Sequence, residues 1–171
     1  YSPERVNPGD NKHSLKKINK ILAYPHEYYK KNLINIYSKV SRKIIFTTNI
    51  REAETAKVIE NIQRDVNIGL VNEIYLVCKK LNINFDNVIR LASTKWNFLK
   101  FNPGLVGGHC LPVDPYYFSH ISKLNKFKTR ITLAGRFIND SMVKFIESKI
   151  ITEIKKLPDL RSRNKHRKFE S

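Results

Sequence analysis

A glycine- and proline-rich segment, residues 102–115, carries the residues best suited to chemistry. It contains three of the six glycines, three of the seven prolines and one of the two cysteines of the chain. Glycines let a backbone pass close to a ligand, and prolines stiffen the turns around it. A thiol in such a turn is displayed, and backbone N–H groups and cations near a turn can make a thiol more reactive. Cys110 is therefore the candidate nucleophile, and Asp114 follows it by four residues.

Other uses of Cys110 fit the sequence less well. Adjacent side chains seldom pair, so His109 is a poor base for a Cys/His protease. The sequence contains no Cys-x-x-Cys and no His/Cys cluster with metal-ligand spacing. Cys78 follows apolar residues of a predicted helix, and this position is typical of a small buried hydrophobe.

A lysine and an asparagine share one face of a predicted long helix. Lys57 and Asn61 are four residues apart, so their side chains are neighbours on that helix. Side by side they could donate hydrogen bonds to an oxyanion that develops on a substrate. A solvated helix face gives the same spacing, so the pattern alone leaves both interpretations open. The turn around Glu4 and Arg5, taken alone, predicts only a surface turn.

The elements expected around these residues are mostly helical. Apolar periodicity predicts helices over about residues 13–23, 27–40, 52–80, 84–92, 116–124 and 129–156. A β-branched and aromatic run predicts one strand over residues 43–48. A helix followed by a strand is typical of the end of an α/β unit. The expected fold is therefore mostly α, with an α/β remnant at the N-terminus.

Composition limits the class of protein. The 171 residues allow one domain, or one domain and part of another. The net charge is +17, but the lysines are spread along the chain, which favours solvated faces over a polyanion site. The run 161–168 is basic and typical of a disordered tail, without aromatic residues to stack on bases. No apolar run approaches the roughly 20 residues of a membrane span, and no signal peptide is visible. We expect a reducing, cytoplasmic location.

Four segments in order resemble the nucleotide-sugar 6-dehydrogenases, the UDP-glucose/GDP-mannose dehydrogenase family. The resemblance is strongest to the UDP-N-acetylhexosamine branch, which serves surface-polysaccharide synthesis. It rests on residues 1–10, 53–73, 95–117 and 133–140. The resemblance implies the end of an NAD-binding Rossmann-like domain, a helical central domain that pairs as a homodimer, and a basic tail, over residues 1–50, 51–157 and 158–171.

The resemblance also implies a mechanism. The family oxidises the C6 alcohol of a UDP-sugar twice with NAD, and a cysteine attacks the intermediate aldehyde. Loss of hydride from the thiohemiacetal leaves a thioester, which water hydrolyses. By position, the resemblance makes Cys110 the nucleophile and Lys57 and Asn61 the oxyanion stabilisers. It makes Asp114 a group that assists in proton transfer or orients water, and Glu4 the acid of thioester hydrolysis. It assigns substrate contacts to Arg5, Val6, Arg64, Lys95, Gly107 and Arg136, the last toward a partner subunit.

Two parts of the family pattern are not found, namely the Gly-x-Gly-x-x-Gly fingerprint and the C-terminal domain. We therefore expect a fragment without dehydrogenase turnover of its own. Two alternatives stay open. One is a non-catalytic dimerisation module with a vestigial site, and the other is a basic nucleic-acid-binding protein. We expect neither a nucleic-acid nor a membrane partner, and the particular UDP-sugar is not determined.

Overall fold

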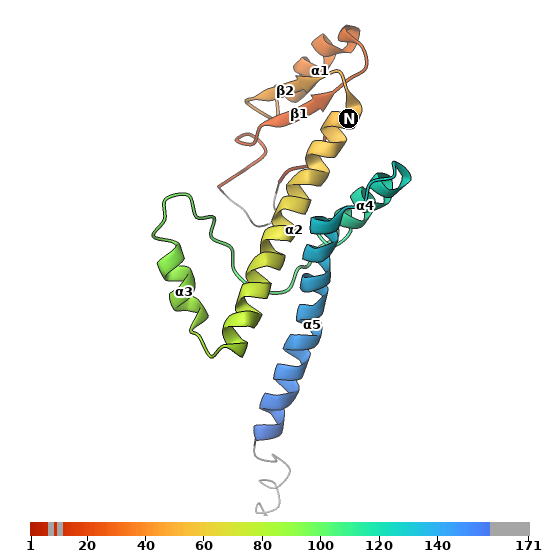
Figure 1. The fold of residues 1–171 in the computed structure, drawn as a ribbon. Helices are drawn as coiled ribbons and strands as arrows, with labels where there is room; N and C mark the ends of the chain where they lie inside the picture. Colours follow the sequence, from red (N-terminus) through yellow and green to blue (C-terminus); the bar gives the residue numbers. More distant parts are fainter. Residues whose placement is uncertain (7–8, 10–11, 158–171) are drawn as a thin grey trace, which may run out of the picture.

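Two long helices lying side by side form the axis of the molecule. The structure is a computed structural model that describes residues 1–6, 9 and 12–157 (Figure 1). Helix α2 (Ile50–Lys80) and helix α5 (Arg130–Lys156) pack against each other, and α4 (Asp114–Leu124) contacts both. Helix α3 (Phe85–Ala92) packs at the C-terminal end of α2. The mostly helical fold is confirmed, while the predicted basic tail lies outside the described residues.

A small α/β unit sits at the N-terminal end of α2 (Figure 1). Strands β1 (Lys20–Ala23) and β2 (Ile44–Thr47) pair in parallel, with Lys20 opposite Ile44. The 3-10 helix η1 (Glu27–Tyr29) and helix α1 (Lys30–Tyr37) connect them, because parallel strands need a crossover connection. The predicted strand and the predicted helix before it are confirmed.

The helix predicted over residues 13–23 is wrong. Residues 15–17 form a turn, and residues 20–23 form β1. A short apolar run is ambiguous between a helix and a buried strand, and here contacts from distant segments decide. The N–H group of Ala23 donates to the carbonyl of Tyr1, and the N-terminal amine of Tyr1 donates back to the carbonyl of Ala23, both at 2.8 Å. Residue 1 and β2 thus hold β1 from its two sides.

Local signals explain the helix boundaries. Asn49 precedes α2, and its side chain accepts a hydrogen bond from the N–H group of Arg51 at 3.0 Å. Asn84 caps α3 in the same way by accepting from the N–H group of Asn87 at 3.0 Å, as the sequence predicted. The core between these helices includes Cys78, which is 6% exposed. Cys78 is therefore a buried hydrophobe, as expected.

The backbones of α2 and α5 touch at two glycines. A Cβ atom placed on Gly69 would lie 2.9 Å from the carbonyl oxygen of Gly135. A Cβ atom on Gly135 would lie 3.1 Å from the Cα atom of Val66. The close approach therefore depends on the absence of a side chain at residue 69.

Polar side chains fill the interface on either side of this contact. Arg136 Nη1 donates to Asp65 Oδ1 at 2.5 Å, and Asn139 Nδ2 donates to the same oxygen at 2.9 Å. Asn72 Nδ2 donates to Asn139 Oδ1 at 2.9 Å. Asp65 and Asn72 are fully buried. Burial raises the pKa of Asp65, while Arg136 and Asn139 oppose that shift. Within the described part of the chain, the Oδ2 atom of Asp65 has no hydrogen-bond partner.

No helix among residues 1–6, 9 and 12–157 is both long enough and apolar enough to cross a membrane.

The glycine contact predicts that Gly69→Ala destabilises the fold. Alanine in place of glycine inside a helix is normally favourable by about 0.5–1 kcal/mol. Here the added methyl group meets the backbone of α5, and overpacking of this kind costs about 1–3 kcal/mol. Thermal unfolding followed by circular dichroism should show a lower midpoint. Gly107→Ala is the control, because its Cβ atom meets nothing within 4 Å. A midpoint for Gly69→Ala at or above that of the parent would contradict the close contact.

Candidate functional site

The loop between α3 and α4 presents the candidate nucleophile. Cys110 is an exposed free thiol. Its carbonyl oxygen accepts hydrogen bonds from the N–H groups of Val113 at 3.1 Å and Asp114 at 2.9 Å, so it starts the turn that enters α4. Two residues earlier, Gly108 has a φ of 93°, in the left-handed region that favours glycine. The backbone that displays Cys110 therefore depends on Gly108.

Asn61 joins this loop to α2. Its Nδ2 atom donates to Asp114 Oδ2 at 2.6 Å, across 53 residues of sequence. Asn61 is 5% exposed, so the contact lies at the α2–α4 interface. Lys57 is one turn earlier on α2 and is half-buried. The structure thus brings together Asn61 and Asp114 and places Lys57 on the adjoining turn.

The other end of the loop is also attached to α2. Asn72 Nδ2 donates to the carbonyl oxygen of Gly104 at 3.0 Å, and the N–H group of Gly104 donates to Asn72 Oδ1 at 2.8 Å. Residues 105–113, which include Cys110, therefore lie between two points attached to the same helix. Sequence reasoning missed Asn72.

The first residues of the chain place Glu4 near Lys57. Glu4 Oε1 accepts hydrogen bonds at 2.8 Å from the N–H groups of Val6 and Arg5. The Val6 hydrogen bond is the largest cause that lowers the pKa of Glu4, and the charges of Lys20 and Lys57 act in the same direction. The carboxylate form of Glu4 is therefore favoured over the acid form.

Arg5 is held against α2. Its Nη2 atom pairs with Glu60 at 2.7 Å, and its Nη1 atom donates to the carbonyl of Asn19 at 2.9 Å. The Arg5 guanidinium is thus paired with Glu60, the residue directly before Asn61. Val6 contributes only its backbone N–H group to the contacts described above.

Tyr1 is a neighbour of the site that sequence reasoning did not single out. Partial burial raises the pKa of its hydroxyl, and the negative charges of Glu54, Asp114 and Glu60 add to the effect. The phenol therefore lies in the field of the carboxylate that Asn61 holds. The sequence signal that could have pointed to Tyr1 is its position directly before the Ser2-Pro3-Glu4 turn.

In the part of the chain that the structure describes, none of the other residues predicted to contact substrate forms a hydrogen bond or ion pair with Cys110. Arg64, Lys95 and Gly107 are exposed. Arg136 is 3% exposed, and its guanidinium is shared between Asp65 of α2 and Asp140, one turn further along α5. Their roles toward a substrate stay predictions.

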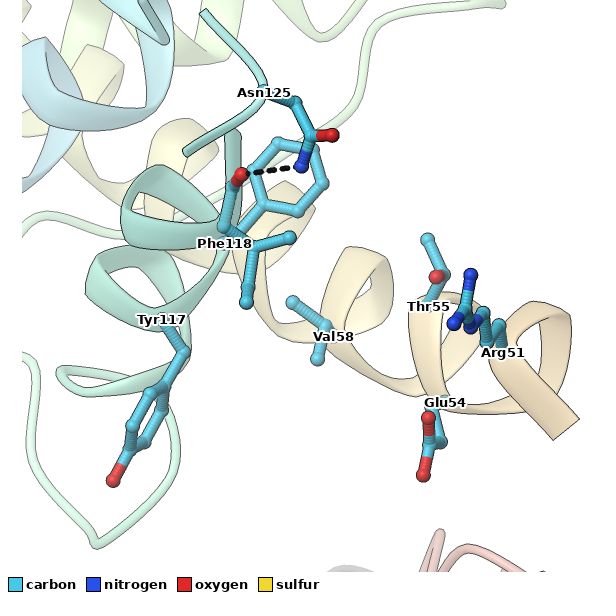
Figure 2. Close-up of a pocket in the computed structure, with 8 residues that line it drawn as sticks. Arg51, Glu54, Thr55, Val58, Tyr117, Phe118 and Asn125 are labelled. Atoms are coloured by element: carbon cyan, nitrogen blue, oxygen red, sulfur yellow. Dashed lines mark hydrogen bonds between the residues drawn. The ribbon is translucent and has the colours of Figure 1, made fainter. Parts of the chain in front are cut away.

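A large groove lies elsewhere. It has a volume of about 610 Å³ and opens between the first turns of α2 and the part of α4 from Tyr117 to its C-cap Asn125 (Figure 2). Figure 2 shows Arg51, Glu54 and Val58 on α2, with Tyr117 and Phe118 on α4. None of the predicted site residues lines it. Among the residues that the structure describes, no group of three His, Cys, Asp or Glu side chains could hold a metal ion.

The fold and site define a helical domain that displays a free thiol on a glycine-rich loop, docked on a helix bearing Lys57 and Asn61. Residues 51–141 match the model of the UDP-glucose/GDP-mannose dehydrogenase family, central domain, and the chain belongs to this family. The predicted resemblance is thereby confirmed. The family is NAD-dependent in general.

Individual relatives support the same assignment. The chain is 47% identical over 152 residues to the UDP-N-acetyl-D-glucosamine 6-dehydrogenase of Salmonella typhi, covering 88% of this chain and 36% of the relative. It is 46% identical over 157 residues to Protein CapL of Staphylococcus aureus, covering 91% and 37%. A solved structure of the UDP-N-acetyl-mannosamine dehydrogenase Cap5O from S. aureus superposes with a TM-score of 0.73 at 35% identity, covering 91% and 37%. The chain thus spans little more than a third of the length of these relatives.

The contacts of Glu4 predict a low pKa that depends most on the N–H group of Val6. In the parent chain, Glu4 should titrate below its ordinary value of 4.5. Val6→Pro removes the N–H group that donates to Glu4 and should raise the pKa, whereas the control Val6→Ala keeps that group and should leave the pKa unchanged. Any stability that Glu4 contributes is present above its ordinary pKa and is lost as the pH falls through the lowered pKa. Carbon-13 NMR titration of the Glu4 carboxyl measures its pKa in the parent and in each variant. An ordinary pKa in the parent would refute the contact.

Proposed function

We propose that this chain is the nucleophile-bearing part of a UDP-sugar 6-dehydrogenase. The observation that carries the proposal is the hydrogen bond of 2.6 Å from Asn61 Nδ2 to Asp114 Oδ2. It attaches the start of α4, four residues after Cys110, to the helix face that carries Lys57. Three residue types that aldehyde chemistry needs, a thiol, a cation and an amide donor, are thereby assigned to one region.

The proposed step is addition of the Cys110 thiolate to the C6 aldehyde of the sugar. A sulfur–carbon bond forms, and the electron pair of the C=O π bond moves to oxygen, which becomes an alkoxide. Protonation of that oxygen completes the thiohemiacetal. The Asn61 amide has two N–H hydrogens, of which Asp114 accepts one. The second hydrogen and the Lys57 ammonium group would stabilise the alkoxide, and Asp114 would take part in the proton transfer.

The substrate class is proposed from the relatives. One of them is named a UDP-N-acetyl-D-glucosamine 6-dehydrogenase, so we propose a UDP-N-acetylhexosamine here. Arg5, Arg64 and Lys95 would contact its charged diphosphate, and the backbone at Gly107 would approach the sugar. Val6 and Arg136 complete the proposed set. The cytoplasmic location also stays a prediction.

NAD is proposed as the cofactor of the whole protein, but the residues of this chain do not fit its usual site. The six glycines are residues 9, 69, 104, 107, 108 and 135, and they nowhere form Gly-x-Gly-x-x-Gly. The described turn after β1 leads into η1 without a glycine. A dinucleotide pyrophosphate normally rests on such a glycine-rich turn. We therefore assign no step of hydride transfer to residues of this chain.

Addition of the thiol to an aldehyde needs no cofactor, so it can be tested on this chain. The 6-aldehyde of UDP-N-acetylglucosamine should slow alkylation of Cys110 by iodoacetamide, measured by mass spectrometry of the peptides. Buried Cys78 reports in the same sample on any unfolding. Lys57→Met should weaken the protection by about tenfold or more, because the alkoxide loses a charged donor.

The comparison compound is a simple aldehyde at the same concentration. If it protects Cys110 as well as the UDP-sugar aldehyde does, the thiol has no binding site for the nucleotide sugar. If neither aldehyde protects, the assignment of Cys110 as the nucleophile fails. That outcome would favour a dimerisation module with a vestigial site.

We also propose that two copies of the chain pair through α4 and α5. Large apolar side chains lie exposed along these helices and the turn between them, with exposed fractions from 59% to 74%: Ile121, Leu124, Phe127, Ile131 and Phe137. Exposed apolar area that a second copy could cover would favour a protein–protein contact. The pairing is supported by the exposure of these residues.

Pairing predicts twice the chain mass in light scattering. Phe137→Glu should lower the mass to that of one chain, because a carboxylate would be buried in the contact. Leu81→Glu is the matched control, since Leu81 is 62% exposed but follows the last residue of α2. A dimer that survives Phe137→Glu and dissociates with Leu81→Glu would place the contact elsewhere.

A further inference from the structure

A chain of buried amide groups ends on the loop that carries Cys110. Asn72 follows Asn61 by eleven residues, which is close to three helical turns, so the two asparagines lie on nearly the same face of α2. The Asn72 carboxamide meets both polar groups of Gly104, donating to its carbonyl at 3.0 Å and accepting from its N–H group at 2.8 Å. Two bonds to one residue fix both the position and the direction of the backbone there.

The orientation of the Asn72 amide follows from Asp65. The Asp65 carboxylate can only accept hydrogen bonds, so Asn139 must turn its Nδ2 atom toward it, at 2.9 Å. This leaves Asn139 Oδ1 to accept from Asn72 Nδ2 at 2.9 Å. Asn72 Oδ1 then remains for the N–H group of Gly104. Both N–H hydrogens of Asn72 are used, and no side chain other than an amide offers this combination at that length.

We propose that Asn72 is a positioning residue for Cys110, and that Asn139 orients Asn72. The loop is attached to α2 at Gly104 through Asn72 and at Asp114 through Asn61. The intervening residues include two glycines, so their conformational freedom is large unless both ends are held. Release of one end displaces the thiol, and a displacement of about 1 Å at a reacting group costs about 100-fold in rate. The positioning role rests on the proposed function of Cys110, whereas the attachment itself does not.

The first test follows the mobility of Cys110 directly. A nitroxide spin label on Cys110, in the full chain with Cys78→Ala, reports loop motion by its electron paramagnetic resonance line shape. Asn72→Asp keeps the side-chain shape but removes both donors, so it should sharpen the spectrum. Asn67→Ala is the matched control on the same helix, because Asn67 Nδ2 donates to the carbonyl of Gln63, one turn earlier, at 2.7 Å and not to the Cys110 loop as far as the structure describes it. Unchanged line shapes in a folded Asn72→Asp chain would overturn the proposal.

A second variant covers the case in which Asn72→Asp does not fold. Asn72→Gln keeps both amide donors and the acceptor but places them one methylene further from α2, so Gly104 should shift while the polar partners stay satisfied. In chains with both cysteines, rapid alkylation of Cys78 identifies a chain that has unfolded. A folded Asn72→Gln chain with the spectrum of the parent would equally overturn the proposal.

The second test connects position to chemistry. In the aldehyde protection assay, a folded Asn72 variant should lose protection of Cys110 by about tenfold or more, with Cys78 still unreactive. Loss of protection in the parent chain too would refute the proposed function, while the spin-label result would still decide the attachment. Full protection in a variant whose loop has become mobile would refute the positioning role alone.

Discussion

The contact between Asp65 and Arg136 determines how α2 and α5 pack. Both side chains are buried, and an uncompensated buried charge costs several kcal/mol. The pair therefore tolerates little rotation or sliding of one helix along the other. Gly69 lies one turn beyond Asp65 and lets the helix backbones approach until Gly135 touches it. Because the backbones are so close, short polar side chains on either side of the glycines can reach each other.

One face of α2 supplies both this interface and the candidate site. Asn61, Asp65, Gly69 and Asn72 recur at helical spacing along it. Asp65 and Gly69 meet α5, whereas Asn61 and Asn72 hold the two ends of the Cys110 loop. A straight helix fixes the distance between its own side chains, so the loop inherits its span from α2. The large groove of Figure 2 has no part in that attachment.

Much of this arrangement could be predicted from single residues, but the polar interface could not. The Asn84 cap, the exposed thiol and the spacing of Lys57 and Asn61 are local signals, and the helices that carry them are present. The same spacing extended by one turn reaches Asp65, so Asp65 faces inward while its neighbour Arg64 is exposed. From the sequence, a polar residue at that spacing has the same pattern on a solvated face as in a buried polar interface. Only its partners on α5, which are distant in sequence, distinguish these two cases.

The polar interface also explains how packing can set the direction of a loop. Apolar contacts are non-directional, whereas each hydrogen bond constrains an angle as well as a distance. The second carboxylate on Arg136, that of Asp140, accepts from the hydroxyl of Tyr116 at 3.0 Å. Tyr116 is two residues beyond Asp114 on α4. The Arg136 guanidinium is thus linked through Asp140 to α4, the helix that follows Cys110. Through Asp65 and the amides of Asn139 and Asn72 it is also linked to Gly104, where the loop begins. Replacing this interface by leucines would remove the amide that holds Gly104, whereas the Asn61–Asp114 hydrogen bond at the other end of the loop does not belong to it.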